Sequence, residues 1–231
     1  YTIYANQALY KYVAIFGRLN YVLDDKYILN ITGRRDGSSR FGPDRQFGNF
    51  GSVGGGWIFS EEKFFKRYKN WISYGKIKGS FGTTGNDNIG DYQYLSTWSL
   101  SYNSYQGNRG YIPQNLYNPN FEWAVNRKLQ TGIELGFFSN KVVADVIWFR
   151  NRCGNQLVSY LLPSQTGFSS VIQNFNAVVQ NDGIEIEINS PVFQNNTFTW
   201  NASFNLSFPK NKLISFPDLE NSPYKGYYKI G

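Results

Sequence analysis

The chain has 231 residues, of which 19% are aromatic, with a net charge of +7 and no histidine. Without histidine, catalysis or metal binding that depends on an imidazole is excluded, and the single cysteine, Cys153, excludes an internal disulfide. The lysines and arginines are mostly spread singly, which is typical of a solvated surface and not of a nucleic-acid-binding patch.

Alternation of apolar and polar residues with a period of two recurs from one end of the chain to the other. Such alternation predicts a strand with one apolar and one polar face. In chain order, the alternating segments are 13–23, 27–36, 49–59, 74–84, 126–138, 142–152, 179–189 and 198–208. No amphipathic helix is expected between them, apart from one or two helical turns within 60–68.

Two segments show the alternation most clearly, and one is irregular. Residues 198–208, FTWNASFNLSF, alternate large apolar side chains with Thr, Asn and Ser. Residues 184–189, IEIEIN, alternate isoleucine with glutamate and asparagine. In 142–152 the pattern is weaker, because Arg150 shares a face with Val146 and Trp148.

The lengths of the predicted strands and of their connections are those of a membrane-spanning β-barrel. Each strand has roughly 10 to 12 residues, near the ~9–11 that a tilted strand needs to cross a bilayer. No segment approaches the ~18 apolar residues of a spanning helix. The connections 24–26, 139–141 and 190–197 are short and 60–73 is medium, whereas 37–48, 85–125, 153–178 and the part from 209 onward are long. Tight turns at one end and long loops at the other are typical of an outer-membrane barrel.

Aromatic residues gather near the shorter connections, on the apolar side of the alternation. They are Tyr21, Tyr27, Trp57, Phe59, Phe137, Phe198 and Trp200. Rings with this distribution are typical of the aromatic girdle at a membrane–water interface. A core would give no reason for aromatics to collect at one end of the strands.

We therefore expect an all-β fold, an antiparallel up-and-down segment of a transmembrane β-barrel with about eight strands. The apolar faces would contact lipid and the polar faces would line a water-filled lumen. The expected lumen-facing residues are Arg18, Arg34, Lys76, Lys78, Lys128, Glu134, Glu185 and Glu187. A secreted carbohydrate-binding β-sandwich, in which the apolar faces pack together, is the alternative.

Few groups of residues in the sequence suggest a binding or catalytic site. Residues 92–123 mix aromatics with amides and hydroxyls, which suits the stacking and hydrogen bonding of a sugar or peptide; the candidate substrate-binding residues are Tyr92, Tyr94, Trp98, Tyr102 and Tyr105. The same aromatics would equally serve to pack long loops into a folded lid.

A calcium site at Asp87 and Asp91 and an anion site in 34–42 are weaker hypotheses. Glu185 and Glu187 resemble a glycosidase pair only by residue type, so we expect no catalytic site, metal or cofactor.

Five segments resemble one family in order along the chain. They are FGRLNYVLDDKYILNITGRRDGSSRFG (16–42), GKIKGSFGTTGNDNIGDYQY (75–94), YNPNFEW (117–123), NDGIEIEINS (181–190) and NKLISFPDLENSPYKGYYKIG (211–231). They are similar to the barrel of SusC/RagA-type TonB-dependent outer-membrane transporters of Bacteroidetes.

The resemblance implies a barrel of about 22 strands that is filled by an N-terminal plug, with a TonB box and a SusD-like surface lipoprotein as partner. Residues 1–231 would then be a mid-to-late section of the barrel, with the plug and the remaining strands outside them. The implied function is import of oligosaccharides, or otherwise peptides, across the bacterial outer membrane. A passive porin is the alternative within the membrane class.

Overall fold

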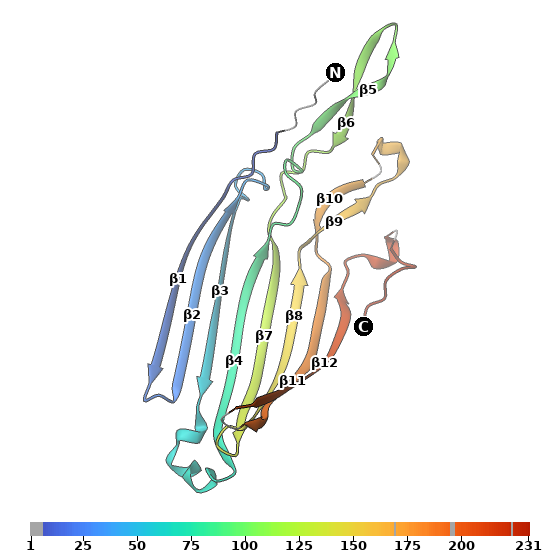
Figure 1. Cartoon of the computed structure of the whole chain (residues 1–231). Coiled ribbons are helices and arrows are strands. Elements are labelled where there is room, and N and C mark those ends of the chain that lie inside the picture. The colour runs from blue at the N-terminus through green and yellow to red at the C-terminus, as the bar shows by residue number, and fades with distance from the viewer. Residues whose placement is uncertain (1–6, 169, 195–196, 223) are drawn as a thin grey trace.

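The computed structural model describes residues 7–168, 170–194, 197–222 and 224–231. Eight long strands form one antiparallel sheet in the order β1-β2-β3-β4-β7-β8-β11-β12. Their bounds are Tyr12–Leu23 (β1), Tyr27–Ser38 (β2), Phe47–Trp57 (β3), Ile72–Asn86 (β4), Ala124–Phe137 (β7), Val142–Gly154 (β8), Val178–Gln194 (β11) and Thr199–Ser215 (β12). This up-and-down sheet, visible in Figure 1, confirms the predicted fold class.

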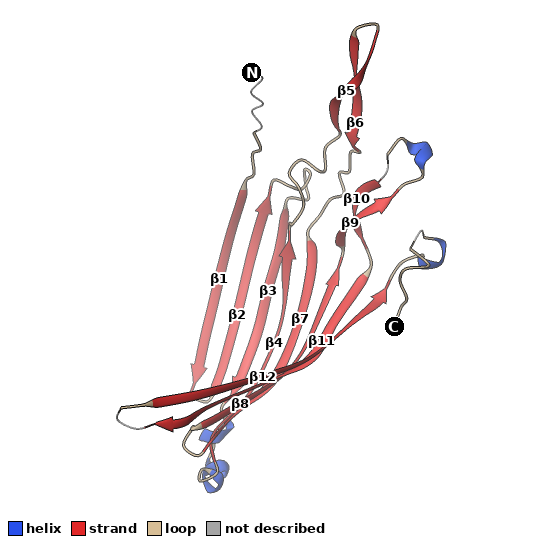
Figure 2. Ribbon diagram, turned by 45° about the vertical axis from the view of Figure 1, so that its right-hand side comes forward, coloured by secondary structure: helices blue, strands red, loops and turns tan. Residues whose placement is uncertain are grey.

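The sheet is twisted and curved, and β1 and β12 are its two edges. Figure 2 shows that β12 and β11 swing across the lower part of the view, so the sheet follows an arc. Consecutive strands pair without a register slip over most of their length, as from Leu23↔Tyr27 to Tyr12↔Ser38 between β1 and β2. Such an arc leaves each strand with two well-separated faces.

Register assigns the side chains to these two faces. We call the face that carries Lys76, Lys78 and Glu187 the polar face, and the face that carries Ile133 and Ile186 the apolar face. Ile133 is opposite Val146, and Val146 is opposite Ile186, so the isoleucines share a face across three strands. The period-two pattern of the sequence therefore becomes a two-sided sheet.

Connections of different kinds lie at opposite ends of the sheet (Figure 1). The short-turn end holds the β1–β2 turn, in which Lys26 N donates to Leu23 O at 3.0 Å, and the β7–β8 turn. It also holds the β3–β4 connection with η1 (Phe59–Glu61) and η2 (Lys63–Tyr68). The β11–β12 connection lies at this end as well, since Gln194 pairs with Thr199. The long-loop end holds the β2–β3, β4–β7 and β8–β11 connections and the segment after β12, so the predicted asymmetry of loop lengths is confirmed.

The long loops contain secondary structure that the alternation did not predict. One loop forms a hairpin of β5 (Thr97–Tyr105) and β6 (Asn108–Asn115). Another forms a hairpin of β9 (Gln156–Leu161) and β10 (Ser170–Phe175), with η3 (Ser164–Thr166) between them, and η4 (Leu219–Asn221) follows β12. In Figure 1 both hairpins extend beyond the end of the main sheet.

The last two strands are longer than predicted, with 17 residues each. The predicted connection over 190–197 starts too early, because β11 continues to Gln194, and the loop predicted from 209 was wrong, because β12 continues to Ser215. Pro191 stands at a β-bulge of β11, and Pro209 stands in the edge strand β12. Bulges and edge strands are among the places in a sheet that accept a proline, which has no N–H to donate.

Five of the seven aromatic residues predicted at the short-turn end follow the prediction, and Phe198, which immediately precedes β12, is not placed by register. Register places Tyr21, Tyr27, Trp57, Phe137 and Trp200 on the apolar face. Phe59 was predicted to join them as a strand residue and instead lies in η1. Its ring is 6.0 Å from that of Trp57 and 5.1 Å from that of Phe65, and it covers Gly75 of β4.

The buried hydrophobic cluster lies at the long-loop end. Phe41, Phe50, Ile89, Phe121 and Trp123 form it, and Phe41 and Phe121 are 0% and 1% exposed. The Trp123 indole is 5.0 Å from the Phe41 ring and 5.5 Å from the Phe50 ring, and its Nε1 donates to Gln46 O at 3.0 Å. This cluster joins the loops that carry Phe41, Ile89 and Phe121 to Phe50 of β3.

Candidate functional site

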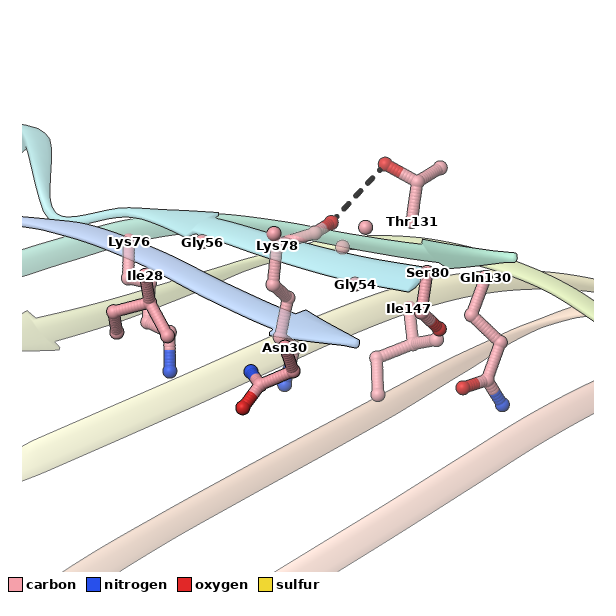
Figure 3. Close-up of a pocket in the computed structure, with 13 residues that line it drawn as sticks. Ile28, Asn30, Gly54, Gly56, Lys76, Lys78, Ser80, Gln130, Thr131 and Ile147 are labelled. Carbon is pink, nitrogen blue, oxygen red and sulfur yellow. Dashed lines mark hydrogen bonds between the residues drawn. The ribbon is translucent and has the colours of Figure 1, made fainter. Parts of the chain in front are cut away.

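The polar face is hollowed at the centre of the sheet. Residues of β2, β3, β4, β7 and β8 line a hollow of about 260 Å³. Figure 3 shows Lys76, Lys78, Asn30 and Gln130 pointing to one side of the sheet. Thr131 points to the other side and donates its Oγ1 hydrogen to Lys78 O at 3.3 Å. The glycines of β3 leave the floor of this hollow open, since they have no side chain to fill it.

Charged side chains of four neighbouring strands lie side by side next to this hollow. Lys76 is opposite Glu134, Glu134 is opposite Asp145, and Asp145 is opposite Glu187, so four charges form one row across the sheet. Lys78 lies next to this row and forms an ion pair with Asp145. Asp145 was not among the predicted lumen residues, although its position in the alternation of 142–152 assigns it to this face.

A second hollow of about 280 Å³ lies at the other end of the same row. Its lining includes Asp145, Glu185, Glu187 and Asn205. Asn189 Nδ2 donates to Glu187 Oε1 at 2.7 Å. Carboxylates thus predominate on the β8–β11 part of the polar face, whereas lysines predominate on the β4 part.

All eight predicted lumen residues share the polar face by register. They are Arg18, Arg34, Lys76, Lys78, Lys128, Glu134, Glu185 and Glu187. Arg18 Nε donates to Asn20 Oδ1 at 3.0 Å, and Arg34 pairs with Asp36 at 2.8 Å. The polar face is not uniformly charged, because the exposed ring of Phe16 lies on it beside Arg34. That this face lines a water-filled lumen stays a prediction.

The opposite face is apolar and largely uncovered. Ile15 is 72% exposed, Phe81 is 50% exposed and Phe208 is 53% exposed. A soluble domain rarely leaves so many large apolar side chains in contact with water over a contiguous surface. The exposure of this face is what a β-barrel wall requires, because lipid is its solvent.

An ordered polar network lies at the base of the long loops. Asp87 Oδ2 accepts from Tyr10 Oη and from Ser38 Oγ, each at 2.8 Å. Arg40 pairs with Asp91 at 2.9 Å and lies over the Tyr10 ring at 4.3 Å. The hydrogen bond to Asp91 raises the pKa of the Arg40 guanidinium. The two aspartates hypothesised as calcium ligands are therefore engaged with protein donors, and Arg40 of the hypothesised anion site already holds a carboxylate.

The five candidate aromatic residues of the long loop do not form one site. Tyr92 Oη accepts from Leu9 N at 2.8 Å, and Tyr94 packs against the buried cluster. Trp98, Tyr102 and Tyr105 lie on the β5–β6 hairpin, where Tyr102 is 97% exposed. Tyr92 and Tyr94 thus serve loop packing, and the three hairpin residues remain candidates for contact with a ligand.

Neither a metal site nor a spanning helix is found in the described part of the chain. No group of three or more Cys, Asp and Glu residues there has the geometry to hold a metal ion. The helical segments among those residues are too short and too polar to cross a membrane.

The sheet and its faces define a class of protein. Long antiparallel strands, one face that exposes large apolar side chains over the middle of the sheet, a charged opposite face and loops of unequal length at the two ends together describe the wall of an outer-membrane β-barrel. Toward the long-loop end, register adds Arg150 and Asp182 to the apolar face. The chain belongs to the TonB dependent receptor-like β-barrel family, whose model matches residues 2–227.

Two curated relatives support the assignment of the chain to this family. The chain is 35% identical to TonB-dependent receptor P3 of Formosa agariphila over 89% of its length, and 30% identical to TonB-dependent receptor SusC of Bacteroides thetaiotaomicron over 92%. It covers 21% and 22% of those proteins, so it spans about a fifth of the length of its curated relatives.

Solved structures show the same fold. The RagAB peptide transporter structure matches with a TM-score of 0.82 at 28% identity, over 90% of this chain and 23% of that one. The siderophore receptor PirA of Pseudomonas aeruginosa matches with a TM-score of 0.58 at 16% identity, over 88% of this chain and 35% of that one, which shows a shared fold only. Proteins of this family are outer-membrane transport proteins and not enzymes, so the predicted location and the prediction of no enzymatic activity are confirmed.

Proposed function

We propose that residues 1–231 form a section of the barrel wall of a SusC/RagA-type importer, with the plug and the remaining strands outside them. This protein takes up oligomeric nutrients across the outer membrane, with energy that the inner-membrane proton gradient supplies through the TonB complex. Oligosaccharides are the first candidate substrate. Peptides are the second, since RagAB, whose structure this chain resembles, is a peptide transporter.

The observation that carries this proposal is the two-faced sheet. The charged row that runs from Lys76 to Glu187 lies on one side, and the exposed isoleucines lie on the other. A wall of this kind separates lipid from water and supplies fixed charges to whatever fills the lumen. We assign the lumen to the polar face and place a plug against it.

The two ends of the sheet have different partners in this proposal. The long-loop end faces the cell exterior, because long loops are extracellular and short turns periplasmic in such barrels. A SusD-like lipoprotein covers this end and delivers the substrate. TonB acts at the short-turn end, through the part of the protein that precedes the barrel.

A deletion of the encoding gene in the native organism tests the proposal. We expect the deletion strain to lose uptake of oligosaccharides and to retain uptake of monosaccharides. Uptake by the parent strain should also stop when a protonophore collapses the proton gradient or when TonB is removed. Uptake that continues without the gradient would identify a passive porin, and a protein that extracts into buffer without detergent would identify the β-sandwich.

The same strains distinguish the two substrate classes. If oligosaccharides are the substrate, labelled oligopeptides enter the deletion strain as fast as the parent. Loss of peptide uptake with unchanged oligosaccharide uptake would assign the importer to peptides.

A further inference from the structure

An open cavity lies at the long-loop end, between the β9–β10 hairpin and the segment that follows β12. Its volume is about 460 Å³. This lies within the range of about 300–1,000 Å³ that is usual for small-molecule sites. Figure 1 shows the hairpin and the C-terminal segment at the same end of the sheet, and the Tyr224 hydroxyl joins them by donating to Ser159 O at 3.1 Å.

Five aromatic rings surround the cavity: Tyr160, Phe175, Phe216, Tyr224 and Tyr228. The Tyr160 and Phe175 rings are stacked, with centroids 6.2 Å apart and planes 20° apart. Phe216 is 4.6 Å from Phe175 and 5.9 Å from Tyr224. Tyr228 lies at the rim, 5.8 Å from Tyr224, and its side chain is 53% exposed. The rings thus form a partial cage with one accessible member.

The cavity opens on the polar face of the sheet. Val179, Asn211 and Leu213 contribute to its lining, and register places Val179 opposite Leu213 on that face. Asn211 Nδ2 donates to Asn181 Oδ1 at 2.6 Å. The rings therefore lie at the outer mouth of the same surface that carries the charged row.

Hydrogen bonds hold the hairpin in place before any ligand arrives. Asn174 Nδ2 donates to Glu122 O at 2.7 Å, and Glu122 N donates to Asn174 Oδ1 at 2.9 Å. These paired bonds fasten β10 to the segment that leads into the buried cluster at Trp123. The cavity is thereby formed in advance, which lowers the entropy that a ligand must lose on binding.

The chemistry of the lining selects the ligand. Among the described residues, the lining carries no charged side chain, and its polar groups are amides and hydroxyls, such as those of Gln156, Asn211 and Tyr224. A charged ligand would lose its hydration there without gaining an ionic partner. A neutral sugar ring fits both features, because its C–H bonds rest on the negative faces of aromatic rings and its hydroxyls bond to amides.

We propose that this aromatic cavity binds one ring of a neutral oligosaccharide at the outer mouth of the barrel. The inference deepens the proposed import function and rests on it for the route of the sugar, but binding itself is measurable without transport. Tyr228 supplies the accessible stacking face, and Tyr160, Phe175 and Phe216 shape the interior.

The test compares two adjacent tyrosines in the full-length protein, purified in detergent. Tyr228→Ala removes the rim ring of the cavity, whereas Tyr227→Ala removes a ring that is 83% exposed and outside the lining. The probes are neutral hexasaccharides of glucose, mannose, xylose and galactose, with a neutral hexapeptide for comparison, and the readout is titration calorimetry. We expect at least one hexasaccharide to bind, with Tyr228→Ala weakening its affinity about tenfold and Tyr227→Ala changing it less than twofold.

Three results would overturn the inference: no hexasaccharide binds, both variants bind equally well, or the hexapeptide binds and loses affinity in Tyr228→Ala. Failure here is separable from failure of the proposed function. If the deletion strain loses oligosaccharide uptake while Tyr228→Ala keeps full affinity, only the cavity assignment fails. If Tyr228→Ala loses affinity while uptake is independent of TonB, only the import mechanism fails.

Discussion

The central stretch of the sheet and its long-loop end are stabilised in different ways. Within the described residues, the buried apolar side chains belong to the long-loop end, from Phe41 to Ala124. The central stretch instead exposes side chains such as Ile77 and Phe81. A sheet without its own core depends on its surroundings, here lipid on one side and a filled lumen on the other, whereas the loop end folds on its own packing.

The largest expected effect is at the loop end. Phe121→Ala removes a fully buried ring of the cluster, and such a change costs about 3–5 kcal/mol of stability. We expect hydrogen exchange across 87–94 and 117–123 to become much faster in the full-length protein, while the middle of β7 and β8 stays protected. Tyr102→Ala, at a ring that is 97% exposed, is the control. Equal effects of the two variants would show that the cluster does not hold the loop.

The next effect concerns the central stretch of the wall. Ile186→Lys places a charge on the apolar face between Val146 and Leu206. It should cost about 2–4 kcal/mol near the bilayer midplane. Glu187→Lys, one residue further and on the other face, should fold normally, because its amine would lie beside Asp145. Urea titration of the protein refolded in lipid vesicles measures both, and the reverse ranking would contradict the assignment of the faces.

A smaller effect is expected in the polar network at the base of the loops. Asp87→Ala leaves the Ser38 hydroxyl, which is 2% exposed, without its carboxylate acceptor. A buried hydrogen-bond donor that has lost its acceptor lowers the free energy of unfolding by about 1–3 kcal/mol. Exposed Asn88→Ala next to it should change stability by less than about 0.5 kcal/mol. Protease cleavage within 39–46 is the measurement, and an unchanged cleavage rate in Asp87→Ala would show that the network is not stabilising.

The smallest effect depends on pH and lies at the short-turn end. Hydrogen bonds from Tyr27 and Trp57, with Lys26 nearby, lower the pKa of the Glu62 carboxyl. The stability that this carboxylate contributes is therefore complete above its ordinary pKa of about 4.3 and is lost as the pH falls through the lowered value. Glu62→Gln should remove this dependence from the hydrogen exchange of 58–71. An identical acid profile in both proteins would exclude the carboxylate as its source.

The faces of the wall could be predicted from the sequence because a strand assigns alternate residues to opposite sides. This is why Arg18 and Glu187, far apart in sequence, were assigned to one face and share it by register. Strand ends were predicted less well. β11 and β12 continue past the predicted ends through Pro191 and Pro209, which the bulge and the edge position accommodate.

The loop end could not be predicted in the same way, because its contacts join distant segments. Arg40 and Asp91 are 51 residues apart, and the rings of the cavity extend from Tyr160 to Tyr228. Alternation gives no information on which loop packs on which. Composition indicated aromatic recognition in residues 92–123, where Tyr92 and Tyr94 serve packing and where contact of Trp98, Tyr102 and Tyr105 with a ligand stays a prediction.

The central claim is that one face of the wall contacts lipid and the other contacts water. Spin labels at Leu206→Cys and Ser207→Cys test it most directly, in the vesicle-embedded full-length protein with Cys153→Ser and no other cysteine. These neighbours lie on opposite faces of β12. We predict that oxygen, which concentrates in lipid, relaxes the label at 206 more strongly, and that a water-soluble nickel complex relaxes the label at 207 more strongly. The opposite pattern, or equal accessibility of both labels to the nickel complex, would contradict the account.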